Sequence, residues 1–221
     1  MDLSLPSAVT APVLNGVAAL DTTHLFAVAA ALGWASGLRL YAVVFLTGLA
    51  GWLGWVPLPG GLQVLQNPLV LGASGLMVAV EFLADKIPAV DSVWDAVHTV
   101  IRIPAGAALA AGAFGGNSAE WTTIAALMGG TLAATAHAAK ATTRAAANTS
   151  PEPFSNIGLS LLGDAAVPVM LWLSWEHPLW FFAALALALV VMVTTTVLLF
   201  KFLRALWRRL SNTYRPGSMQ A

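Results

Sequence analysis

The chain has 221 residues, of which 58% are hydrophobic and only 9% are charged, and its ten basic and ten acidic side chains leave no formal net charge. Soluble domains usually carry about 25% charged residues, so this chain has too few polar side chains to cover a surface that faces water. The zero net charge argues against nucleic acid as a partner, and the absence of cysteine excludes disulfides, thiolate metal sites and cysteine nucleophiles.

We therefore predict an all-α protein, a polytopic transmembrane bundle of about six to seven helices in residues 22–203. Residues 1–21 contain no Lys or Arg, which a secretory signal needs near its start, so they are interpreted as an N-terminal lead-in. Residues 22–55 are too many for one straight span and few for two. The small residues and the arginine of GWASGLR (33–39) predict a short helix, a break near Gly37 and a second helix to Trp55, followed by a loop at 56–67.

Four further segments predict two helical hairpins, residues 68–86 with 90–114 and residues 120–144 with 154–175. In each hairpin an apolar helix ends in charged residues, and a turn that contains proline leads to a helix with a polar stripe. This similarity favours a possible internal repeat of the hairpins in parallel orientation. The alanine and glycine runs at 103–113 and 124–139 predict close helix packing.

The last predicted span, Leu179–Phe200, has 22 residues and no charge, which is enough to cross about 30 Å of hydrocarbon. Half of all the basic residues follow it, so the positive-inside rule places a basic tail (204–221) in the cytoplasm. Lys140 and Arg144 agree with this orientation, which puts residues 145–153 inside and residues 56–67 and 115–119 outside. We therefore expect a multi-pass protein whose C-terminus is cytoplasmic; the resemblance described below implies that the membrane is a bacterial cytoplasmic (inner) membrane.

Polar and ionisable residues recur at helical spacing, and therefore share a face, in four of the predicted spans. The stripes are Glu81 and Asp85; Asp91, Asp95, His98 and Arg102; His137, Lys140 and Arg144; and Asn156, Ser160 and Asp164. With Arg39 at the predicted break and Lys86 after the first stripe, five cations match five anions in these segments. An unpaired charge at the bilayer centre costs about 2.5–3.5 kcal/mol, so we predict one polar core shared between the helices, with Lys86, Asp91 and Arg144 nearer its edge.

Ionisable residues inside a membrane usually mark a functional site, so the sequence favours a transporter or channel for a small ion. The predicted pathway or binding site consists of Arg39, Glu81, Asp85, Asp91, Asp95, His98, Arg102, His137, Lys140, Asn156 and Asp164. Four acidic residues within positions 81–95 favour a cation or a proton, whereas the basic residues would suit an anion. The alternative is a membrane scaffold whose buried ion pairs only hold the bundle together.

A third alternative is a lipid-modifying enzyme with Asp95 and His98 as an acid/base pair, but no nucleophile or phosphate-loop motif supports it, and we predict no enzyme. Glu81, Asp85, Asp95 and His98 are candidate metal ligands, although their spacing does not require a metal. Haem between His98 and His137 would have charged neighbours, so no cofactor is expected. The expected partners are the lipid bilayer, a small ion and possibly further copies of the chain.

Two motifs carry a resemblance to a known family: EFLADKIPAVDSVWDAVHTVIRIPAGA (81–107) and HAAKATTRAAANTSPEPFSNIGLSLLGDA (137–165). Over about residues 25–175 the chain resembles a family of bacterial membrane proteins known as domain of unknown function 4126. The resemblance implies a multi-pass membrane protein, gives no biochemical activity, and covers the polar positions of the stripes. A looser likeness to cation/proton exchangers stays an analogy, because Ile87 stands where their signature has a hydroxyl residue.

Overall fold

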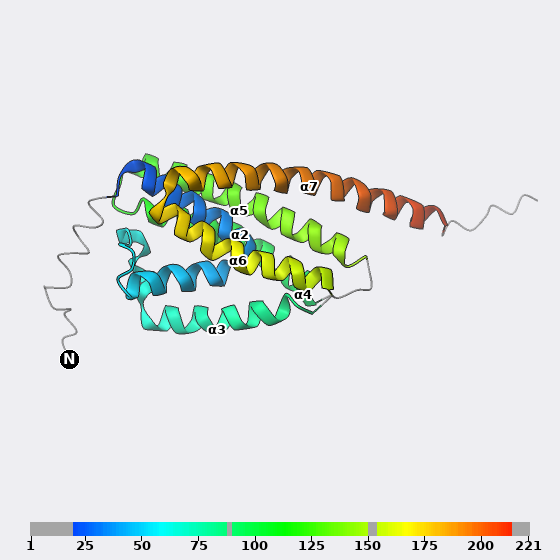
Figure 1. The fold of residues 1–221 in the computed structure, drawn as a ribbon, viewed down its shortest axis with the longest axis horizontal. Coiled ribbons are helices and arrows are strands. Elements are labelled where there is room, and N and C mark those ends of the chain that lie inside the picture. The colour runs from blue at the N-terminus through cyan, green and yellow to red at the C-terminus, as the bar shows by residue number, and fades with distance from the viewer. Residues whose placement is uncertain (1–19, 88–89, 150–153, 214–221) are drawn as a thin grey trace, which may run out of the picture.

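The computed structural model describes residues 20–87, 90–149 and 154–213, except for the side chains of residues 91, 92, 156 and 210–213. Within these residues the chain is helical and has no strand, which confirms the predicted all-α class (Figure 1). The elements are α2 (Thr22–Trp52), the 3-10 helix η1 (Gly60–Gln66), α3 (Pro68–Ala84), α4 (Val90–Ala113), α5 (Ala119–Ala147), α6 (Phe154–Glu176) and α7 (Pro178–Thr213).

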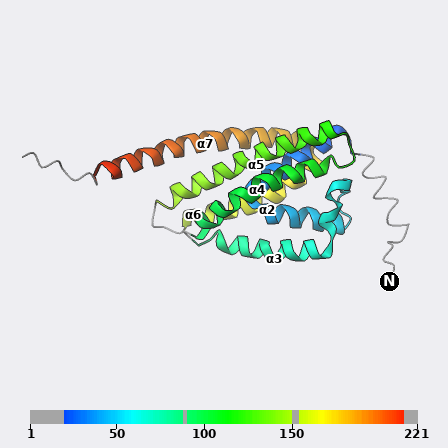
Figure 2. The same cartoon turned by 180° about the vertical axis from the view of Figure 1, so that it is seen from behind.

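Among the described residues four helices, α2, α4, α6 and α7, are long and apolar enough to cross a membrane, and η1 with α3, which meet at 71°, make a fifth span if they are counted together. Helix α5 is less hydrophobic, but it runs along the bundle between α4 and α7 (Figure 2). The apolar helices make this a membrane-embedded protein.

Helix α2 is broken at Arg39, whose backbone torsions (φ −145°, ψ 74°) are not helical, two residues after the predicted break at Gly37. The chain reverses there, so that the second half of α2 runs back beside the first (Figures 1 and 2). Near the start of α2, Phe26 contacts Phe114 in the turn after α4. Its end leads into η1, where Gly61 packs on Gly112 at the end of α4. Both ends of α2 therefore lie at the same end of the bundle, and α2 is a re-entrant hairpin rather than a complete span.

Small residues allow α2 to enter the centre of the bundle. A Cβ added at Gly33 would lie 2.5 Å from Gly129 Cα of α5, and one added at Gly106 of α4 would lie 2.7 Å from Ala133 Cβ. Such contacts leave no room for a larger side chain, as is usual where membrane helices approach closely. The alanine and glycine runs that predicted close packing thus form the contacts among α2, α4 and α5.

The pairing of the other helices differs from the predicted hairpins. Helix α4 packs most extensively against α5, and α3 packs mainly on α2 and scarcely touches α4. Helices α5 and α6 also touch only slightly, whereas α2 packs against both of them. The internal repeat stays a prediction. Helix α2 ends at Trp52 instead of Trp55, η1 occupies most of the predicted loop, and α7 continues without a break through the predicted tail boundary at 204 to Thr213.

Candidate functional site

The break in α2 places the side chain of Arg39 in the interior of the bundle, where it is 4% exposed. One guanidinium nitrogen lies 2.5 Å from Asp85 Oδ2, at the end of α3. The other lies 2.8 Å from Asp164 Oδ1 of α6 and donates a hydrogen bond to Ser160 Oγ. A single arginine at the tip of the re-entrant hairpin therefore joins α2, α3 and α6.

Asp85 is the point at which most of these charges meet. Its Oδ2 also lies 3.0 Å from Lys140 Nζ and 3.3 Å from Arg144 Nη2, and both of these cations come from α5. Arg144 donates a further hydrogen bond to the backbone carbonyl of Asp85 at 2.7 Å. Three cations would repel one another in so small a volume, so a fully buried carboxylate between them is what allows them to converge.

A second group of charges surrounds Arg102 of α4, whose side chain is completely buried. Its guanidinium lies 2.6 Å from Glu81 Oε1 and 2.7 Å from Asp95 Oδ1. Lys140 Nζ lies 3.1 Å from the same Asp95 oxygen and so joins this group to Asp85. On the far side of Asp164, Lys86 lies 3.7 Å from the second carboxylate oxygen. One continuous network of charges thus connects all five helices from α2 to α6.

The two histidines lie beside this network. His98 Nδ1 is 2.8 Å from the carbonyl of Trp94, so this nitrogen is the donor, and Nε2 accepts from Tyr41 Oη at 3.1 Å. His137 Nδ1 accepts from Arg102, which has only donors, and its Nε2 donates to Thr99 Oγ1 at 2.7 Å. Asp95 and His98 therefore have different partners, and the described contacts do not join them as an acid/base pair.

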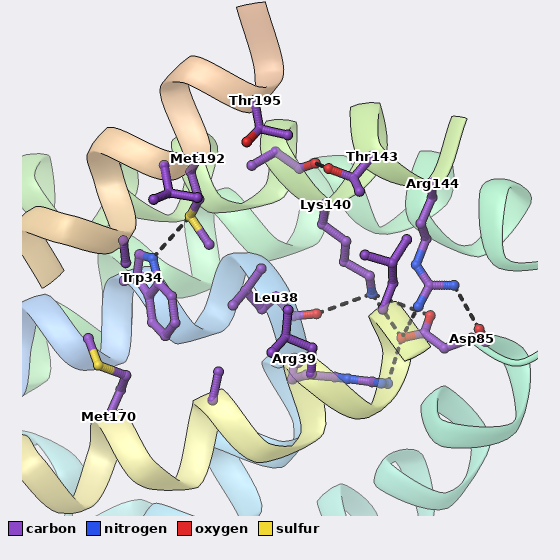
Figure 3. Close-up of a pocket in the computed structure, with 17 residues that line it drawn as sticks. Trp34, Leu38, Arg39, Asp85, Lys140, Thr143, Arg144, Met170, Met192 and Thr195 are labelled. Atoms are coloured by element: carbon purple, nitrogen blue, oxygen red, sulfur yellow. Dashed lines mark hydrogen bonds and ion pairs between the residues drawn. The ribbon is translucent and has the colours of Figure 1, made fainter. Parts of the chain in front are cut away.

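A cavity of about 420 Å³ reaches the network between α2, α5, α6 and α7 (Figure 3). Arg39, Asp85, Lys140 and Arg144 form one end of its wall, and Trp34, Met170 and Met192 lie toward the other end (Figure 3). Except for Thr143 and Thr195, the remaining lining residues are leucine, alanine, glycine and valine. The cavity is therefore apolar along most of its length and charged at one end, with three cations and one anion.

The structure brings most of the predicted site residues together. Arg39, Glu81, Asp85, Asp95, Arg102, Lys140 and Asp164 form the network, His137 contacts it through Arg102, and His98 lies at its side. The side chains of Asp91 and Asn156 lie outside the described residues. Arg144 was expected near the edge of the polar core, but it is buried in it. Lys86 is more exposed and covers the ring of Phe82.

Other positions that contact the predicted site residues were missed from the sequence. Tyr41 and Thr99 are the partners of the two histidines, and the carbonyl of Leu38, freed by the break in α2, accepts a hydrogen bond from Lys140 at 3.2 Å. A backbone acceptor has no signal in a sequence. Tyr41 did have a signal in the sequence, because it is the single tyrosine among the predicted spans.

The candidate metal ligands face cations. Glu81, Asp85 and Asp95 each lie against arginine or lysine, and within the described part of the chain no group of three or more His, Asp or Glu side chains is arranged to hold a metal ion. These carboxylates are already neutralised by cations of the protein itself.

The model of one family matches this chain over residues 26–197, and the description of that family is Domain of unknown function (DUF4126). The chain belongs to this family. The match covers the whole charged network and the cavity, in agreement with the resemblance seen in the two motifs. No curated protein and no solved structure is significantly similar to the chain.

Proposed function

We propose that this DUF4126 protein is a membrane transporter or channel for a small ion, with the charged network and the adjoining cavity as its pathway. The observation that carries the proposal is the tip of α2, where Arg39 and the carbonyl of Leu38 meet charged side chains inside the bundle. Irregular backbone at membrane depth is tolerated where it is buried in protein or lines a cavity, and broken helices of this kind form the ion sites of many transporters.

The charges in the cavity wall favour an anion. Of the four charged side chains that line it, only Asp85 is acidic, and Glu81 and Asp95 lie behind the cations instead of facing the cavity. An incoming anion would meet Arg39, Lys140 and Arg144 and would compete with Asp85 for them. A cation or proton, which the sequence favoured, would have to displace one of these cations from its carboxylate.

The scaffold alternative accounts less well for the incomplete pairing inside the network. Glu81 is 1% exposed, yet its Oε2 has no hydrogen-bond partner among the described residues, and the same is true of Nε of the fully buried Arg102. Buried polar atoms without partners are costly, and a network that served only stability would gain by satisfying them. This supports a role in function over a purely structural one.

The orientation follows from the basic residues, and we propose that the C-terminal end of α7 lies in the cytoplasm of a bacterial inner membrane. Both ends of α2, together with η1 and residues 115–118, would then face outward. The partners that go with this proposal are the bilayer, the transported ion and possibly further copies of the chain.

The proposal is tested by ion flux in proteoliposomes with a panel of chloride, phosphate, octyl phosphate, K⁺, Na⁺ and protons. We expect at least one anion to move faster than in empty vesicles, and Lys140→Gln to slow it about tenfold or more, because a charged hydrogen-bond donor contributes about 1.5–3 kcal/mol. Lys201→Gln, the same change on the exposed surface of α7, should leave the flux unchanged.

Movement of cations or protons without any anion would overturn the choice of an anion. If no member of the panel moves, transport is wrong and the scaffold interpretation replaces it. Purified variants are compared only after size-exclusion chromatography has established that each is folded and monodisperse.

A further inference from the structure

The cavity is built for more than a small ion, because most of its wall has no polar group to replace a hydration shell. Met170, Met192 and Trp34 surround its inner part, and Trp34 Nε1 is itself satisfied by Met192 Sδ at 3.3 Å. Ligand pockets of about 300–1,000 Å³ with a few polar groups in an apolar wall are typical sites for organic molecules. The apolar part of this cavity would therefore remain unused by an inorganic ion.

The mouth of the cavity opens toward lipid. Leu162 of α6 and Val191 of α7 both line the cavity, yet they are 67% and 55% exposed. Exposed leucine and valine on membrane helices face hydrocarbon chains rather than water. A molecule that enters between α6 and α7 would therefore come from the bilayer.

The charged end and the apolar end of the cavity also follow the same order as the headgroup and the chains of a lipid in one leaflet. Its cations lie near the end of α5, where Arg144 precedes the last helical residue Ala147 by one turn. Trp34 and Met170 lie farther from that end (Figure 3). A headgroup near this end and a chain directed toward the centre of the bundle would follow the orientation of the neighbouring lipids.

We infer that the cavity binds an amphiphilic anion, whose phosphate or carboxylate headgroup pairs with Arg39, Lys140 and Arg144 and whose hydrocarbon chain lies between α6 and α7. This inference rests on the proposed function and names the chemical class of its substrate. The headgroup approaches the face of the cations that Asp85 does not occupy, and the chain replaces no hydrogen bond in the apolar part. The occupant is either a phospholipid of the bilayer or a free single-chain anion, since both present the same headgroup and chain.

The inference is tested by native mass spectrometry of the whole protein in a neutral detergent, with four ligands. Dodecyl phosphate carries both headgroup and chain, inorganic phosphate only the headgroup, dodecanol only the chain, and phosphatidic acid represents a bilayer lipid. We expect one dodecyl phosphate or one phosphatidic acid to bind each chain, and the tighter of the two identifies the source. Phosphate and dodecanol should bind at least about tenfold more weakly, because each lacks one half of the recognised structure.

Two pairs of variants separate the headgroup contacts from the chain contacts. Lys140→Gln should weaken binding about tenfold or more, against Lys201→Gln as control. Because Lys140 is buried and its loss could unfold the chain, a second pair leaves the charges intact. Ala188→Phe places a ring in the cavity and should abolish binding, whereas Ala186→Phe, on the exposed face of the same helix, should not.

Equal affinity of all four ligands, or equal binding by Ala188→Phe and Ala186→Phe, would overturn the inference. Flux of an inorganic anion without binding of dodecyl phosphate would overturn it as well, while the proposed transport would stand. Binding that obeys both variant pairs in a protein without any flux would leave the lipid site established and overturn transport instead.

Discussion

The burial of Arg102 is costly, because its guanidinium is fully removed from solvent and depends on two carboxylates. Glu81 reaches it from α3, and Asp95 lies two turns earlier on α4 itself. Asp95 has a second cation in Lys140, whereas among the described residues Glu81 forms its ion pair with Arg102 alone. The two acidic partners are therefore not equivalent.

Removing Arg102 should destabilise the protein more than removing the charge of Glu81. Breaking a buried ion pair from one side costs about 3–5 kcal/mol, so Arg102→Met is expected in that range. Glu81→Gln should cost less, because Arg102 retains Asp95. The double variant should be more stable than Arg102→Met, since no carboxylate of Glu81 is then left unpaired.

The free energy of unfolding of all three variants is measured in mixed detergent micelles, with Lys201→Met as an exposed control. A double variant less stable than Arg102→Met would show that Glu81 is not held by Arg102.

At the scale of the elements, α2 shows what a single sequence can reveal and what it cannot. The small residues and Arg39 of GWASGLR predicted a break, and the break is there. The reversal of the chain was not predicted, because hydropathy and length do not show in which direction the second half of α2 runs relative to the first. The glycines that let the first half of α2 pack on α5, Gly33 and Gly129, carry no information on which helix they will meet.

Because these glycines pack closely, we expect the stability of the protein to be sensitive to an added methyl group at Gly33. Gly33→Ala places a Cβ 2.5 Å from the Gly129 backbone, which cannot move aside as a flexible side chain could. Overpacking of this kind costs about 1–3 kcal/mol, so the unfolding free energy should fall by that amount. Gly72→Ala in α3 meets nothing within 4 Å and should be neutral or slightly stabilising. Equal effects of the two changes in mixed micelles would contradict the packing of α2 on α5.

The helical phase of the charged stripes is the feature that the sequence predicted best. Spacings of three and four placed Asp95 and Arg102 on one face, and the cost of exposing charge to lipid required partners for both. The cavity could not be predicted, because it depends on how α7 covers the gap between α5 and α6. The position of a residue within its stripe also did not reveal how deeply it is buried. Arg144 is buried although it is the last charge of its stripe.

At the scale of the whole molecule, the re-entrant hairpin fixes which segments share a side of the membrane. The chain has no cysteine, so single cysteines can be introduced at Thr22, Leu53, Ser118 and Thr149 without interference. We expect the first three to react with an impermeant thiol reagent from one side and Thr149 from the other. A straight α2 would instead place Thr22 and Leu53 on opposite sides, and labelling in that pattern would exclude the re-entrant hairpin.

The most direct test of the central claim, that the charged core carries an anion, is the sign of the charge that moves. Proteoliposomes adsorbed on a solid-supported membrane are exposed to a concentration jump of octyl phosphate, and the transient current is recorded. We predict a current that carries negative charge into the vesicles, reduced about tenfold or more in Lys140→Gln and unchanged in Lys201→Gln. A current of the opposite sign, or one of equal size in Lys140→Gln, would contradict the account.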